Sequence, residues 1–155
     1  MPATVFDSLS QRLTDAGVTF DVLRHAPVYT SQEAAAVRGT ALSSGATALV
    51  CKADDRFVMF VLPADRKLAS KQVRSQTGIR SLRFASREEV EHLTSLAPGS
   101  IPPFGSLFGL ATFCDRRLAA EPRINFNAGD HSISISLSYA DFEKVEQPTL
   151  GDYSE

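Results

Sequence analysis

Two apolar segments separated by two aspartates constrain the fold of this chain more than any other feature. Residues 46–53 and 56–62 are largely apolar, and only Asp54 and Asp55 lie between them. Segments of this length and character are typical of strands, and a two-residue connection is the length that joins neighbouring antiparallel strands. The pattern therefore predicts a tight β-hairpin in the first half of the chain.

The remaining segments predict short strands that alternate with helices. Capping boxes at 30–33 and 86–89 mark two helix starts, because the hydroxyl and the acid three residues later each bond the other's backbone amide. Another expected helix carries Lys67, Lys71 and Arg74 on one face. Further helices are expected near the N-terminus and after Ser138, and further strands at 18–23, 82–85, 110–114, 124–126 and 132–137. This order favours an α/β fold with a mixed, largely antiparallel sheet and surrounding helices, and it disfavours a doubly wound sheet.

The length of 155 residues fits one domain. We expect this domain to span 1–148, and we expect 149–155 to form a flexible C-terminal tail. No apolar run approaches the roughly 18 residues of a membrane span, and the N-terminus does not resemble a signal peptide. Cys51 and Cys114 lie in apolar segments without a CxxC or Cys/His cluster, which favours buried free thiols, a cytoplasmic protein and no metal or cofactor.

Charge is distributed unevenly along the chain. The net charge is −2, yet 66–87 contains seven basic residues and no acidic one. Such a segment can form a local phosphate-binding face, and it can equally be the solvated flank of a helix.

Four loops contain the residues most suited to chemistry, because loops at the ends of strands and helices often form sites. His25 and Pro27 precede the capped helix that begins with Thr30 and Ser31. Asp65 and Lys67 follow the second hairpin strand. We interpret His25, Thr30, Ser31, Asp65 and Lys67 as candidate substrate-binding residues.

The other two loops are rich in glycine and proline. The segment 99–105 contains Gly99, Ser100 and Pro103, a combination that leaves little conformational freedom and allows backbone groups to approach a ligand. The segment 126–131 contains a glycine turn, and its candidate binding residues are Asn127, Gly129 and His131. The chain has no GxSxG, P-loop, HExxH or GxGxxG motif, so hydrolysis would depend on positioning and backbone hydrogen bonds.

Together the four loops resemble the YbaK / prolyl-tRNA-synthetase-associated editing domains. The segments 25–34, 61–65, 99–105 and 126–129 match that family in order and approximate spacing, over roughly residues 9–145. The resemblance implies a compact mixed-sheet fold and a free-standing aminoacyl-tRNA deacylase that removes a wrong amino acid in trans. Its partner would be the acceptor end of aminoacyl-tRNA, with an aminoacyl-tRNA synthetase as a further candidate.

The resemblance also implies roles for particular residues. The segment from Gly99 through Ser100 to Pro103 resembles the family's GxxxP loop, whose backbone holds the substrate, while the substrate's own 2′-hydroxyl activates water. The family's lysine aligns with Thr47, which carries no charge. Lys52 lies five residues on and therefore faces the opposite side of the strand, which leaves Arg66 and Lys67 as candidate cations. Catalytic candidates are thus Gly99, Ser100, Pro103 and Thr47.

Thr47 leaves alternatives open. One is a non-catalytic module that binds aminoacyl-adenosine, a nucleotide or a synthetase, and another is a deacylase of a small metabolite. The sequence does not identify the amino acid or the tRNA, although alanine and serine are plausible cargo, and Leu62 could line the pocket with Thr30 and Thr47. We expect a monomer or a weak homodimer.

Overall fold

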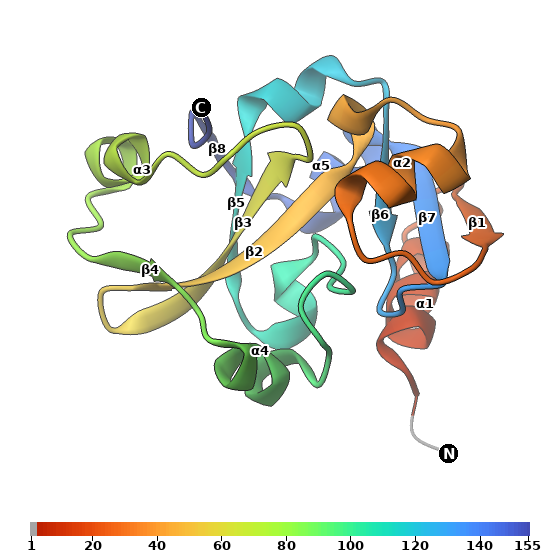
Figure 1. The fold of residues 1–155 in the computed structure, drawn as a ribbon, viewed down its shortest axis with the longest axis horizontal. Coiled ribbons are helices and arrows are strands. Elements are labelled where there is room, and N and C mark those ends of the chain that lie inside the picture. The colour runs from red at the N-terminus through yellow and green to blue at the C-terminus, as the bar shows by residue number, and fades with distance from the viewer. Residues whose placement is uncertain (1–2) are drawn as a thin grey trace.

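The computed structural model describes residues 3–155, in which two β-sheets pack against each other with helices around them (Figure 1). The helices are α1 Val5–Asp15, α2 Ser31–Arg38, α3 Ser70–Thr77, α4 Arg87–Thr94 and α5 Tyr139–Glu146. The strands are β1 Asp21–Arg24, β2 Ala46–Ala53, β3 Arg56–Pro63, β4 Leu82–Phe84, β5 Ala111–Asp115, β6 Arg123–Asn127, β7 Ile133–Ser138 and β8 Thr149–Gly151. No helix among these residues is long and apolar enough to cross a membrane.

The predicted hairpin forms the centre of the larger sheet. Strands β2 and β3 pair antiparallel from Ala46↔Pro63 to Ala53↔Arg56. Asp54 adopts a positive φ of 56° in the turn, and its carboxylate accepts the amides of Arg80 and Ser81. The sheet order is β4-β2-β3-β5-β8, in which β5 and β8 run parallel to their neighbours.

The smaller sheet, of order β1-β7-β6, is antiparallel throughout. A parallel bridge between Gly45 and Asn125 brings the start of β2 next to β6 and so joins the two sheets. The predicted mixed, largely antiparallel α/β fold is confirmed, and the sheet is divided into two.

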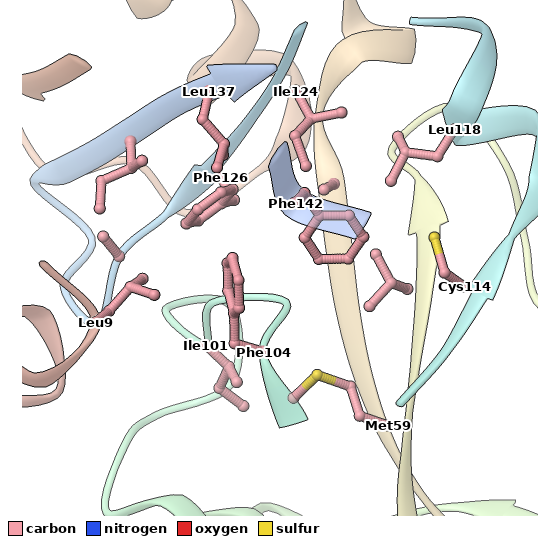
Figure 2. Close-up of a cluster of buried hydrophobic side chains, with 14 of the residues drawn as sticks. Leu9, Met59, Ile101, Phe104, Cys114, Leu118, Ile124, Phe126, Leu137 and Phe142 are labelled. Carbon is pink, nitrogen blue, oxygen red and sulfur yellow. The ribbon is translucent and has the colours of Figure 1, made fainter. Parts of the chain in front are cut away.

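Alternating side chains of β3 fill two separate cores. Met59 and Val61 belong to the main core, whereas Val58, Phe60 and Leu62 belong to a second core on the opposite face of the sheet, as the two-residue period of a strand requires. The rings of Phe104, Phe126 and Phe142 meet in the main core, where Ile101 of the 99–105 loop also packs (Figure 2). This loop is therefore anchored by burial.

Both cysteines are buried free thiols, as predicted. Burial raises the pKa of Cys51 and of Cys114 to about 12. Thiols with such a pKa are almost fully protonated at neutral pH and make poor nucleophiles.

Two local predictions differ from the structure. Helix α3 begins at Ser70, so Lys67 precedes the helix and does not share a face with Lys71 and Arg74. The predicted flexible tail is also wrong, because β8 pairs with β5 and the Tyr153 side chain is only 2% exposed. Burial of the Tyr153 ring in the second core holds this segment in place, although the neighbouring residues are polar.

Candidate active site

A cleft of about 110 Å³ lies where α2, the start of β2, β6 and the 99–105 loop meet. The capping box of α2 has formed as predicted, with Thr30 Oγ1 accepting the Glu33 amide at 3.0 Å and the Glu33 carboxylate accepting the Thr30 amide at 3.0 Å. Gly39 then ends α2 in the left-handed conformation with φ 69°. The helix is consequently short, and residues from both of its ends line the cleft.

Five of the predicted site residues line this cleft: Thr30, Ser31, Thr47, Gly99 and Asn127. They come from three of the four predicted loops and from β2, so the structure brings together segments up to 97 positions apart, from Thr30 to Asn127. The cleft is therefore the candidate active site.

The polar groups of the lining are mostly neutral. Within residues 3–155, the hydroxyls of Ser31, Thr40 and Thr47 form no hydrogen bond, and neither do the amides of Gly99 and Ile101. Free hydroxyls and amides of this kind can bind a polar ligand. The lining contains no histidine, cysteine, lysine or carboxylate among the described residues, and the same residues hold no group suited to a metal ion.

The loop that contains Gly99 is held in place by the β6–β7 turn. Asn127 Nδ2 donates to the Gly99 carbonyl at 2.9 Å, and the Gly129 amide donates to the Ser100 carbonyl at 2.8 Å. Gly99 has a φ of 91°, a region that residues with a side chain rarely occupy. These two hydrogen bonds fix the Gly99–Ser100 peptide and the Ser100–Ile101 peptide that follows it.

Several predicted residues lie outside the lining. The Ser100 hydroxyl donates to the Ala97 carbonyl at 2.8 Å, so it is used within the loop. Pro103 is a buried residue of the same loop and does not line the cleft. Gly129 acts through the backbone bond described above. His131 packs against the ring of Tyr29 at a tilt of 39°, with 4.7 Å between the centroids.

His25 also lies behind the cleft, where its Nε2 is 2.8 Å from Ser134 Oγ. Asp65 and Lys67 follow the lining residue Ala64 but are exposed beside it. Lys67 exchanges two backbone hydrogen bonds with Glu155. Leu62 packs into the second core and does not line the cleft.

Arg38 is a functional candidate that no sequence motif indicates. It lines the cleft from the last turn of α2, and its Nε donates to Ser134 Oγ at 2.8 Å while Nη2 donates to Asn127 Oδ1 at 2.9 Å. Burial lowers the pKa of Arg38 to about 10, so the guanidinium stays charged at neutral pH. The candidate cations Arg66 and Lys67 do not line the cleft.

The fold and the cleft define a class of protein: an α/β domain with a small polar cleft and no histidine, cysteine or carboxylate among the described lining residues. The pattern of the aminoacyl-tRNA editing domain matches residues 25–145. The chain belongs to this family, which confirms the resemblance, and the predicted class of aminoacyl-tRNA deacylase follows from that membership.

Individual relatives agree with this assignment. The chain is 35% identical to the multifunctional Ser/Thr-tRNA deacylase ProXp-y of Escherichia coli over 91% of this chain and 87% of the relative. It is 31% identical to a proline--tRNA ligase of Bacillus licheniformis over 75% of this chain and 21% of the ligase. A crystal structure described as a candidate trans-editing enzyme for prolyl-tRNA synthetase shares the fold, with a TM-score of 0.87 and 21% identity over 100% of this chain and 99% of that one.

Proposed function

We propose that this protein hydrolyses, in trans, the ester that links serine or threonine to a tRNA. The observation that carries the proposal is the cleft itself, which is lined by Ser31, Thr40 and Thr47 with unpaired hydroxyls and by Gly99 and Ile101 with free amides. A hydroxylated amino acid can pair with such hydroxyls. The Escherichia coli relative is named for serine and threonine, which supports the same choice.

The size of the cleft also favours a small amino acid. At about 110 Å³ it is well below the roughly 300–1,000 Å³ of pockets that enclose a whole small-molecule ligand. The aminoacyl group would occupy the cleft, and the terminal adenosine would lie across its rim.

The chemistry would depend on backbone groups and on the substrate. Water attacks the ester carbonyl carbon, the bond from that carbon to the ribose oxygen breaks, and the ribose oxygen takes a proton. The free amides of Gly99 and Ile101 would donate to the oxygen that becomes negative, and one preorganised donor of this kind typically contributes ~2.7–4 kcal/mol. Since the described lining offers no carboxylate or histidine, we assign the base to the vicinal ribose hydroxyl.

A panel of charged tRNAs tests the proposed substrate. Purified protein should deacylate Ser-tRNA and Thr-tRNA faster than Ala-tRNA or Pro-tRNA, measured as release of labelled amino acid. Thr47→Val removes one lining hydroxyl and keeps the shape, so kcat/KM for Ser-tRNA should fall about tenfold, the equivalent of one net hydrogen bond. Hydrolysis of Ala-tRNA should change little.

Thr19→Val, in an exposed position outside the cleft, is the matched control and should behave as the parent protein. Equal losses for Ser-tRNA and Ala-tRNA in Thr47→Val would show that Thr47 does not bind the hydroxyl. Binding of charged tRNA without any turnover would favour the non-catalytic module.

Tyr29 is suited to bind the terminal base. Its ring is 71% exposed at the rim of the cleft and rests on His131, and the stacking of a base on an aromatic ring contributes about 1–3 kcal/mol. Tyr29→Ala should therefore weaken binding of charged tRNA at least about fivefold by filter binding, and Tyr29→Phe should keep most of the affinity. Phe84→Ala is the control, because Phe84 is 61% exposed but lies outside the lining. A similar loss in both alanine variants would contradict a specific base platform.

The remaining partners follow from this proposal. The protein would bind the acceptor end of tRNA in the cytoplasm. The proline--tRNA ligase relative supports a synthetase as a further partner, and the region that matches this chain makes up 21% of that ligase. In the basic segment 66–87, Arg83 and Arg87 are already paired with Glu89 and Glu91 of α4, so the other basic residues are the candidates for tRNA contact. A monomer or weak homodimer stays a prediction.

A further inference from the structure

Arg38 is the one charged side chain in the cleft lining among residues 3–155. It stands in the last turn of α2, directly before the helix-ending Gly39, and α2 lies beside the β6–β7 hairpin (Figure 1). A basic residue is common in the last turn of a helix, because its positive charge interacts favourably with the helix dipole. The helix dipole accounts for neither the half-buried guanidinium nor its contacts with β6 and β7.

The protein satisfies only part of the guanidinium. Nε and Nη2 donate to Ser134 and Asn127, both of which offer neutral oxygens. A guanidinium has five N–H donors in a fixed fork, so three of them have no partner in the described structure. No carboxylate of the part of the chain that the structure covers lies within 4.0 Å of Arg38.

A charge withdrawn from water without a counter-ion is costly. The cost is visible in the pKa of Arg38, which burial lowers to about 10. An anion that enters the cleft would supply the missing charge and would occupy the free N–H groups. Arginine forks match the oxygens of phosphate especially well.

We propose that Arg38 binds the phosphate group of the terminal nucleotide of the tRNA. This inference rests on the proposed function, because the substrate of that reaction defines which anion is present. In an aminoacyl ester the carboxyl group is esterified and the amino group is cationic, so the phosphodiester is the negative group nearest to the reacting bond. Arg38 would thus hold the nucleotide while the Gly99 loop holds the acyl group.

A pair of stable substrate analogues measures this contact directly. One is adenosine with a 3′-serylamide in place of the ester, and the other is the same compound with a 5′-phosphate methyl ester. For the parent protein, calorimetry should show that the phosphate improves affinity about tenfold to a hundredfold, as expected of hydrogen bonds to a charged group. In Arg38→Gln this improvement should shrink to about twofold or less, and in Arg38→Lys it should be intermediate.

The analogue without phosphate is the internal control, because a structural role of Arg38 through Asn127 would weaken both analogues equally. Arg56→Gln, an exposed arginine at the start of β3 outside both the cleft and the basic segment, should leave the phosphate effect unchanged. Equal weakening of the two analogues in Arg38→Gln overturns the inference, and so does the absence of a phosphate effect in the parent protein. Inorganic phosphate that competes at the same concentration as the nucleotide would also overturn it, because the site would then bind free phosphate.

The outcome is independent of the proposed reaction. A phosphate effect that requires Arg38, in a protein that hydrolyses no charged tRNA, would support the inference and contradict the deacylase. Hydrolysis of Ser-tRNA without any phosphate effect would do the reverse.

Discussion

Gly99→Ala is expected to lower kcat/KM for Ser-tRNA at least about a hundredfold, the effect of losing one preorganised backbone donor. Gly99 has a φ of 91°, and a residue with a Cβ in such a conformation is strained by about 1–3 kcal/mol. The added methyl group would also meet His131 Cε1 at 3.4 Å. The backbone would rotate to relieve the strain and would move the free Gly99 amide away from the reacting carbonyl.

The surrounding contacts explain why a small movement matters. Asn127 holds the carbonyl of the Gly99–Ser100 peptide and Gly129 holds the carbonyl of the Ser100–Ile101 peptide, so the chain after Gly99 is held more firmly than the free Gly99 amide before it. Ile101, two residues further on, is buried in the main core at 7% exposure. Strain at Gly99 is therefore confined to the part of the loop that lines the cleft.

Gly78→Ala is the control that distinguishes a loss of stability caused by backbone strain from a loss of catalytic activity. Gly78 ends α3 with a φ of 77°, nothing lies within 4 Å of the position that a Cβ would take, and the residue is outside the cleft. Both variants should lose comparable stability in thermal melts, but only Gly99→Ala should lose activity in single-turnover deacylation. Gly99→Ala with full activity, or both variants with the same loss of activity, would show that the loop backbone is not the catalytic element.

Much of the fold was predictable because its signals are local. The β2–β3 hairpin needs only two apolar segments and a short turn, and the capping boxes before α2 and α4 need only residues three apart. Local chemistry also identified Gly99, Asn127 and Thr30, since glycine, asparagine and N-cap residues mark turns and helix starts. These residues do lie at the cleft.

Arg38 could not be recognised in the same way. An arginine in the last turn of an alanine-rich helix looks like an ordinary surface residue. Its importance depends on Asn127 and Ser134, which lie 89 and 96 positions away. Conversely, His131 and Ser100 are near the site in sequence, but their side chains contact Tyr29 and Ala97. Side-chain direction in loops depends on tertiary packing that no spacing rule describes.

The C-terminal segment illustrates the same limit for the fold. Its composition suggested a frayed tail, but its partners lie in β5 and in the turn after β3, far away in sequence. Tyr153 packs edge-on against Phe60 and Phe113, with centroid distances of 5.5 and 5.9 Å. Leu68 and Ser154 form an antiparallel bridge beside it. The segment is thus part of the second core.

Asp115→Ala is expected to destabilise the protein by about 3 kcal/mol or more, because hydrogen bonds to a charged group contribute ~1.5–3 kcal/mol each. Asp115 is 0% exposed, and its carboxylate accepts the amides of Arg117 and Tyr153, both at 2.8 Å. Alanine would leave both amides without a partner and would release the C-terminal segment from the end of β5. For a chain of 155 residues, a loss of that size corresponds to a melting temperature lower by roughly 6–12 °C.

Asp152→Ala is the matched control, since Asp152 is an exposed acid in the same segment and exposed substitutions usually change stability by no more than about 0.5 kcal/mol. Circular dichroism melts measure both variants. Asp115 lies outside the cleft lining, so Asp115→Ala should keep its kcat/KM within about twofold at temperatures where it is folded; that factor equals about 0.4 kcal/mol. If Asp115→Ala melts together with the parent protein, the buried carboxylate does not hold the C-terminal segment, and the flexible tail predicted from the sequence would be the better description.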